Sequence, residues 1–334
     1  MSGERAAGAV LGLAVGDAAG WPAARHRSLA HAPWSRRLYR ELETFAEEHR
    51  VTTLPVPFAL NQPTAPLALG PSDDAEWVAW TLLTLDAAAK DAGADPAGGR
   101  ARVAAFRALA GREEVRARIS VATALDNLAR GLEPPASGHD NPHFFDDAAA
   151  VRAVAFGVRG LDPAADAAVT NSGDGVLGAL AMAAAVREAI ASGDVRRAVR
   201  AALDVLPEDT AIGLNARRAL KAARAAGDAF AALPALDAEL IDHVYSYGVA
   251  ASVTVPIALA LAEVSGGTVA AIPAAACLAA TADSAPALTG ALVGACGGAS
   301  VIPEQWAAAA RRLSGCCLPD LGGRDLLDIV EGIA

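Results

Sequence analysis

Residues 264–303 have the sequence VSGGTVAAIPAAACLAATADSAPALTGALVGACGGASVIP, and this stretch decides how the rest of the chain must fold. Asp283 is its only charged residue, and the others are small or apolar, which predicts helices buried on every side. A buried carboxylate is unfavourable unless a partner neutralises it. Thr281 and Ser284 add hydroxyl oxygens beside it, so either a cation or polar ligand binds here, or Asp283 and Ser284 cap a helix.

A second acidic motif follows another uncharged stretch. Residues 51–71 carry no charge, and Ser72-Asp73-Asp74 comes directly after them. An N-cap serine with acids in the first helical turn explains one aspartate, because the helix dipole favours anions there. Two adjacent carboxylates behind a long uncharged loop fit a ligand site better. Both acidic motifs offer only oxygen ligands, which hard cations such as Mg²⁺ or Ca²⁺ prefer.

The composition predicts an all-α bundle with a large core. Apolar residues make up 53% of the chain and aromatic residues only 4%, so Ala, Leu and Val, which favour closely packed helices, supply the core. No linker or repeat divides the sequence, and we expect a single domain over residues 1–334. The net charge of −10 argues against nucleic acid as a partner, because such proteins present a basic face.

The four cysteines have neither zinc nor disulfide-framework spacing, which favours reduced thiols and a cytoplasmic location. Residues 284–302 are uncharged and long enough to raise the question of a membrane span. They are rich in Ala and Gly and poor in Leu, Ile and Phe, so we expect no membrane insertion.

Three further segments bear on the site. A helix predicted over residues 4–17 carries Gly8, Gly12 and Gly16, with Gly20 following at the same spacing of four, which lets another backbone approach closely. Asp17, at its end, is a candidate site residue. Helices are also predicted over residues 73–90 and 113–131. Residues 133–147 combine histidines, aromatics and acids, a composition typical of pocket linings, although a surface loop explains any one histidine equally well.

These motifs together resemble a known family. GAVLGLAVGDAAGWP, residues 8–22, resembles the opening of the ADP-ribosylglycohydrolases. Ser72-Asp73-Asp74 is similar to their Ser/Thr-Asp-Asp metal motif, and Ala282-Asp283-Ser284 to their late Asp-x-Asp-Thr/Ser motif. The matches occur in the family's order and span almost the whole chain.

The resemblance implies a compact all-α bundle with a metal site at its centre, one or two Mg²⁺ or Mn²⁺ ions, and hydrolysis of the bond from C1″ of an ADP-ribose to its acceptor. The implied catalytic residues are Asp73, Asp74 and Asp283. The implied metal ligands are Ser72, Asp73, Asp74, Thr281, Asp283 and Ser284. The candidate substrate contacts are Asp17, His143, Phe144, Phe145, Asp146, Asp147, Asn171 and Tyr247.

Three positions depart from the family pattern. Thr281 stands where the family usually has an aspartate, Ala24 where it often has a glutamate, and Asn171 where a histidine is common. These departures indicate a changed substrate, a single metal ion or lost hydrolysis. Fewer ligand charges weaken divalent-ion binding.

The sequence thus predicts a Mg²⁺-dependent hydrolase that cleaves an N- or O-glycosidic bond to a ribosyl group. Its partner would be an ADP-ribosylated protein or a smaller riboside, and the few aromatic residues favour a small ligand. The alternative is a non-hydrolytic ligand-binding or structural protein on the same fold.

Overall fold

The structure is a computed structural model that describes residues 2–20, 44, 47–50, 70–90, 95–242 and 248–331. Its contacts divide the chain into two units, Met1–Gly20 with Gly70–Ala334, and Trp21–Leu69. All that follows concerns the first and larger unit, and the single domain over residues 1–334 stays a prediction.

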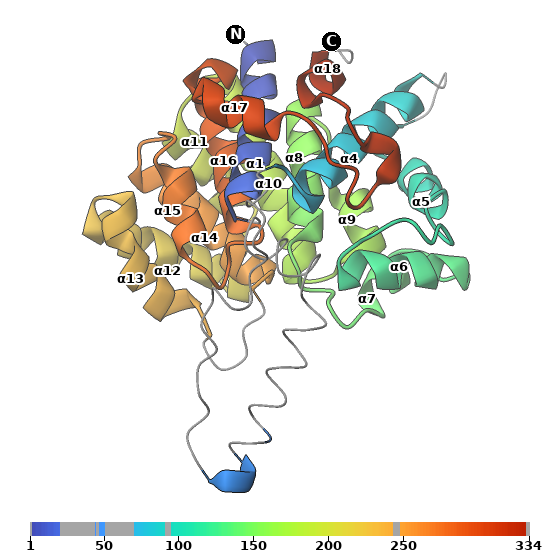
Figure 1. The fold of residues 1–334 in the computed structure, drawn as a ribbon, viewed down its shortest axis with the longest axis horizontal. Coiled ribbons are helices and arrows are strands. Elements are labelled where there is room, and N and C mark those ends of the chain that lie inside the picture. Colours follow the sequence, from blue (N-terminus) through green and yellow to red (C-terminus); the bar gives the residue numbers. More distant parts are fainter. Residues whose placement is uncertain are drawn as a thin grey trace. The chain divides into compact units, whose positions relative to one another are not determined.

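The larger unit is built from helices (Figure 1). They are α1 (Ser2–Gly20), α4 (Asp73–Ala89), α5 (Gly99–Arg107), α6 (Ile119–Ala129), α7 (Ala136–His139), α8 (Ala148–Arg159), α9 (Ala164–Thr170), α10 (Asp174–Ser192), α11 (Val195–Asp204), α12 (Ala211–Ala226), α13 (Ala229–Leu240), α14 (Ala251–Val264), α15 (Ala271–Cys277), α16 (Ala285–Gly297), the 3₁₀ turns η3 (Ala299–Val301) and η4 (Pro319–Leu321), α17 (Glu304–Ala310) and α18 (Leu326–Glu331). In the described part of the chain the only extended pairing is in isolated bridges, between Asp146 and Ala250 and between Arg312 and Asp325. The predicted all-α fold is confirmed.

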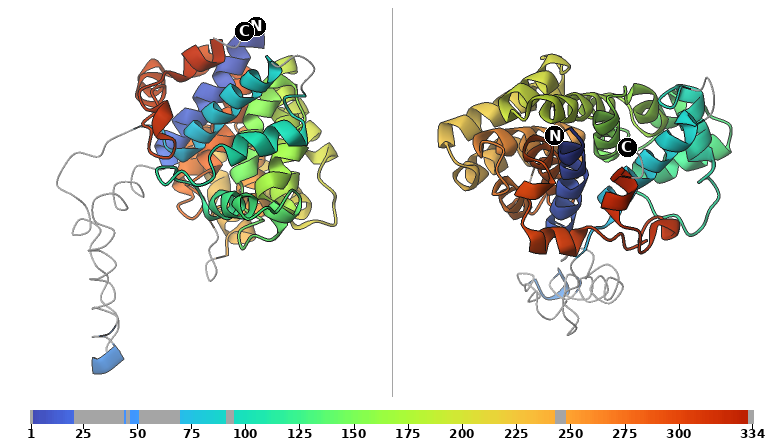
Figure 2. Two further views of the ribbon diagram at one scale, coloured as in Figure 1. Left: turned by 90° about the vertical axis from the view of Figure 1, so that its right-hand side faces the viewer. Right: turned by 90° about the horizontal axis from the view of Figure 1, so that it is seen from above.

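The first helix and the late uncharged stretch form the centre of this unit. α1 packs along α16, and Figures 1 and 2 show α1 with orange and red helices on one side and green helices on the other. A Cβ atom added at Gly12 would lie 2.1 Å from the carbonyl oxygen of Gly290, and one added at Gly290 would lie 2.0 Å from that of Gly12. The predicted close approach of a second backbone to the glycines of α1 is therefore confirmed, and α16 supplies that backbone.

Burial agrees with the sequence in α16 and less so in α15. Every residue from 285 to 296 is buried, as predicted for a helix enclosed on all sides. Cys277, at the end of α15, is exposed. Among the described helices, α10 has the length and hydropathy of a membrane span, but 61% of that window is buried inside the protein.

Two helix boundaries differ from the predictions in ways that matter for the site. α1 continues to Gly20, so Asp17 lies inside a helix and not at its end. The helix predicted over residues 113–131 begins only at Ile119, and Arg118 is its N-cap. The residues just before Arg118 form turns and an irregular segment, and this places the arginine at the start of a helix.

Candidate functional site

The amino-terminal ends of four helices meet at one point. The N-cap residues of α4, α6, α8 and α16 are Ser72, Arg118, Asp147 and Ser284. Hydrogen bonds from Arg118 to Asp74, Asp147 and Ser284 join these helix starts directly. Helix amino-termini favour anions, because their unpaired N–H groups carry partial positive charge. The arrangement explains why carboxylates gather here from distant parts of the sequence.

The guanidinium of Arg118 lies in the middle of these carboxylates. Its side chain is 11% exposed, and all three of its nitrogens contact acidic oxygens. The contacts run from Nε to Asp73 Oδ2 (3.2 Å), from Nη1 to Asp147 Oδ1, and from Nη2 to Asp74 Oδ1 (2.7 Å), Asp283 Oδ2 (3.3 Å) and Ser284 Oγ (2.6 Å). One cation thus faces four carboxylates.

Burial controls the protonation of this cluster. It raises the pKa of Asp147 to about 7 and that of Asp74 well above its ordinary value, and Arg118 opposes both shifts. Burial also raises the pKa of Asp283, although its side chain is 30% exposed and forms the cluster's open side. For Arg118, burial alone would lower the pKa, but Asp74 and Asp147 outweigh it and keep the guanidinium charged. The carboxylates exceed the positive charge available to them.

Two buried carboxylate oxygens test whether a divalent ion fits here. Asp74 Oδ2 and Asp147 Oδ2 are buried and accept no hydrogen bond. Unpaired buried oxygens are unfavourable, and hard cations take such ligands. The donor set of carboxylates and serine hydroxyls therefore fits a divalent ion, with Asp73, Asp74, Asp283, Ser72 and Ser284 as the predicted ligands near these oxygens.

Asp17 holds the start of α4 in position through hydrogen bonds. It is fully buried, and its carboxylate accepts hydrogen bonds from the backbone nitrogens of Ser72 (2.7 Å) and Ala75 (3.0 Å) and from the Ser72 hydroxyl. It thereby caps the first turn of α4 from a different helix. Burial, and next the charge of Asp73, raise its pKa to about 7. This geometry gives Asp17 a positioning role, and a direct substrate contact stays a prediction.

Asn171 holds the acidic loop in the same way. Its side-chain amide donates to the carbonyl oxygens of Phe144 (3.2 Å) and Asp146 (3.0 Å) and to Asp146 Oδ1 (2.9 Å). The backbone nitrogen of Asp147 donates to the carbonyl of Val249 (2.8 Å), so the loop is fixed on two sides. Asn171 is itself buried, and its hydrogen bonds fix Asp146, which immediately precedes the N-cap of α8.

The aromatic residues of this loop form a group of stacked rings. Phe144 stacks on His139 with centroids 6.4 Å apart, and Phe145 stacks on His143 at 5.6 Å. Phe144 and Phe145 meet edge to face, and Phe144 is 40% exposed. The structure therefore brings His143, Phe144 and Phe145 together next to Asp146 and Asp147.

The remaining residues singled out in the sequence are Thr281, Tyr247 and Ala24. Thr281 is buried, and its hydroxyl donates to the carbonyl of Leu278 at 3.3 Å. Tyr247 and Ala24 lie outside the residues that the structure describes.

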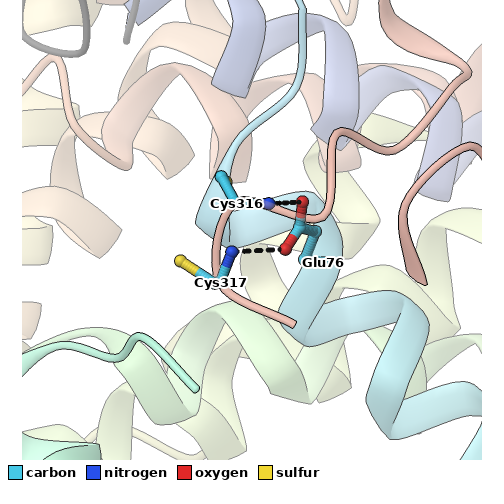
Figure 3. A group of neighbouring side chains, drawn as sticks. All are labelled: Glu76, Cys316 and Cys317. Atoms are coloured by element: carbon cyan, nitrogen blue, oxygen red, sulfur yellow. Dashed lines mark hydrogen bonds between the residues drawn. The ribbon is translucent and has the colours of Figure 1, made fainter. Parts of the chain in front are cut away.

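A second polar group in the described part of the chain involves α4 and the segment before η4. Atoms of Glu76, Cys316 and Cys317 that could bind a metal lie within 4.8 Å of one another. The buried Glu76 carboxylate already accepts hydrogen bonds from the backbone nitrogens of Cys316 (2.8 Å), Cys317 (2.8 Å) and Leu318 (2.9 Å) and from the Ser314 hydroxyl (3.1 Å), and Figure 3 shows the cysteine nitrogens facing it. Because both oxygens are occupied by these donors, Glu76 ties the late segment to α4 in preference to binding a metal.

Comparison with known proteins shows the family and the fold. The family model of ADP-ribosylglycohydrolase matches residues 2–333, almost the entire chain. The chain belongs to the ADP-ribosylglycohydrolase family. Its fold is similar to that of a solved structure described as an ADP-ribosylglycohydrolase-related protein complex, with a TM-score of 0.56, 17% identity, and coverage of 99% of this chain and 96% of the other. No curated protein matches the sequence.

Membership of the ADP-ribosylglycohydrolase family supports a glycohydrolase-type activity on ADP-ribosyl-like substrates. Arg118 is the one member of the cluster that the sequence did not predict as a site residue. A lone arginine inside a segment predicted to be helical resembles any solvated surface residue, and only its place at a helix start reveals its contacts.

Proposed function

We propose that this ADP-ribosylglycohydrolase hydrolyses an N- or O-glycosidic bond to a ribosyl group and depends on Mg²⁺ or Mn²⁺. The observation that supports it most is the convergence of Ser72-Asp73-Asp74 with Asp283-Ser284 on one buried cluster that retains unpaired carboxylate oxygens. The free thiols of the four cysteines are compatible with a cytoplasmic location.

The predicted ligands of the ion are Asp73, Asp74 and Asp283, with hydroxyls from Ser72, Thr281 and Ser284. A divalent ion bound there would supply positive charge that polarises ribose hydroxyls and a water molecule. Asp283 is 30% exposed, more than Asp73, Asp74 or Asp147, so it is the carboxylate that an incoming substrate would meet first. The buried carboxylates would stabilise positive charge that develops on the ribosyl ring as the glycosidic bond breaks.

The loop that Asn171 holds would orient the substrate. Phe144 is 40% exposed, and the backbone and side chain of Asp146 are fixed two residues after it. A stacked ring next to carboxylates suits a ligand that has an apolar ring face at one end and hydroxyl donors at the other. This favours a riboside or ADP-ribosyl conjugate as substrate.

A turnover assay tests this proposal. ADP-ribosyl-arginine, ADP-ribosyl-serine, nucleosides and ribose phosphates are incubated with the protein in Mg²⁺ and, in parallel, in chelator, and products are identified by mass spectrometry. We expect metal-dependent release of a ribosyl product from at least one compound. Release that is equal in chelator would contradict the metal dependence.

The cluster also favours a second candidate function. Because the Arg118 guanidinium already fills the centre of the carboxylates, a protein that binds a riboside without cleaving it is compatible with the same geometry. Saturable binding of one panel member with no turnover over hours, with or without metal, would support this alternative.

A further inference from the structure

Arg118 is an unfavourable residue for its place in the chain. It is the N-cap of α6, where the helix dipole repels a cation, and its side chain is largely withdrawn from water. The carboxylates supply the compensation, since Asp73, Asp74 and Asp147 each pair with a different guanidinium nitrogen. The ion pairs with this cluster, and not the helix, therefore determine where the guanidinium lies.

The guanidinium and a divalent ion would use the same oxygens. Nη2 alone lies 2.7 Å from Asp74 Oδ1, 2.6 Å from Ser284 Oγ and 3.3 Å from Asp283 Oδ2. These oxygens come from both acidic motifs, and a divalent ion bridging the motifs would need to lie among them at about 2.0–2.6 Å. Two cations cannot share that space, and like charges so close together repel strongly.

We infer that Arg118 is a built-in cation of this site. Its guanidinium takes the position of a divalent ion, so the protein binds one ion fewer than its carboxylates would hold without the arginine. The oxygens left for one further ion are Asp74 Oδ2 and Asp147 Oδ2, which accept no hydrogen bond. Asp147 would then replace Asp283 and Ser284 among the ligands, because Nη2 already contacts the oxygens of those two residues. The inference rests on the proposed function only in taking this cluster as the metal site, and it does not require that the protein cleave a substrate.

The test counts bound ions and not turnover. Chelator-treated wild-type protein and the variants Arg118→Gln, Arg118→Lys and Arg116→Gln are titrated with Mn²⁺ by calorimetry, and bound Mn²⁺ is counted independently by electron paramagnetic resonance. Arg116 is the matched control, because it is exposed and lies two residues before Arg118. Circular dichroism and thermal unfolding in chelator and in Mn²⁺ report whether each variant is folded.

We expect Arg118→Gln to bind one more Mn²⁺ than the wild type, and Arg118→Lys and Arg116→Gln to match the wild type. In chelator, Arg118→Gln should unfold at a lower temperature than the wild type, and Mn²⁺ should restore most of the loss, because an ion then replaces the missing charge.

Equal Mn²⁺ counts for wild type and folded Arg118→Gln would overturn the inference. Two Mn²⁺ ions bound to the wild type would also overturn the inference. This count needs only the wild type, so it tests the inference even if Arg118→Gln does not fold. No ion in the wild type and one in Arg118→Gln would support the position assigned to Arg118, but it would refute the further ion expected in the wild type and the metal dependence of the proposed function, so the two failures are distinguishable.

Discussion

Asp74 and Asp283 come from opposite ends of the chain and contact the same guanidinium nitrogen. Replacing either residue by Asn exchanges one carboxylate oxygen for an amide nitrogen and gives a neutral side chain of nearly the same shape. Asp74 is buried, and its pKa is raised by that burial, which means that its charged form is unfavourable in the folded protein. Replacement by Asn removes this unfavourable charge. The carboxylate is expected to matter for chemistry more than for folding.

We predict that Asp74→Asn and Asp283→Asn each reduce turnover to below about 1% of wild type, since removing preorganised charge from a buried site lowers kcat by about 10²–10³-fold. Both variants should remain folded by circular dichroism. Asp126→Asn, an exposed position on α6, is the control and should retain full activity. Unchanged turnover in both site variants would refute the assignment of these residues.

At the scale of the element, backbone contact between α1 and α16 positions two parts of the site, because α1 carries Asp17 and Ser284 is the N-cap of α16. We predict that Gly12→Ala destabilises the protein by about 1–3 kcal/mol or more, because the new methyl would lie 2.1 Å from the Gly290 carbonyl oxygen, which belongs to a backbone that cannot yield. Urea unfolding measures the change.

Gly3→Ala is the matched control for Gly12→Ala. It lies in the same helix, and a Cβ there meets no atom within 4 Å, so the substitution should be neutral or slightly stabilising through helix propensity. Equal effects at Gly3 and Gly12 would contradict the close packing of the two helices.

A buried ion triad links α5, α8 and α9. Asp166 accepts from Arg102 Nε and from Arg152 Nε, both at 2.9 Å, and all three side chains are almost completely buried. Arg102 also lies 5.4 Å from the Trp80 ring centroid, which connects the triad to α4. We predict that Asp166→Asn lowers the free energy of unfolding by about 3–5 kcal/mol at pH 7, because it leaves two buried cations without their carboxylate.

The contribution of this triad to stability should depend on pH. Burial alone would raise the pKa of Asp166, but Arg152 and Arg102 outweigh it and hold the pKa below 3.8. Its contribution is therefore fully present above pH 3.8 and is lost as the pH falls through the lower pKa of the folded state. In urea titrations, the difference in the free energy of unfolding between wild type and Asp166→Asn should become smaller below pH 3.8. The control is Asp204→Asn, at an exposed position, and its difference from wild type should stay near zero at every pH. A widening difference would contradict this assignment.

At the scale of the whole molecule, ion binding should couple to folding, because the predicted ligands lie at or just before the starts of α4 and α16 and meet only in the folded state. We predict that Mg²⁺ or Mn²⁺ raises the melting temperature and that chelator reverses the rise. An ion at one hundred times its dissociation constant adds about 2.7 kcal/mol of stability. Differential scanning calorimetry checks this, and Asp74→Asn should lose the response. A wild-type melting temperature that does not respond to either ion would contradict the prediction.

Several features followed from the sequence alone. The uncharged stretch around Asp283 predicted a buried helix, and α16 is buried from residue 285 to residue 296. The glycine spacing predicted a close helix contact, because spacing along a helix is a local property. The Ser-Asp-Asp and Asp-Ser motifs were found because acids inside apolar surroundings stand out, and the tertiary structure brings them to one guanidinium.

Only the tertiary structure decided how that cluster is neutralised. Asp17 and Asn171 stay predicted substrate contacts, and the fold adds that they hydrogen-bond to Ser72 and Asp146 and hold these residues in position. Arg118 carried no signal in the sequence, since an arginine beside charged neighbours is ordinary on a surface. Its role depends on the meeting of four helix starts, and the distances among residues far apart in the chain are set by packing and not by local pattern.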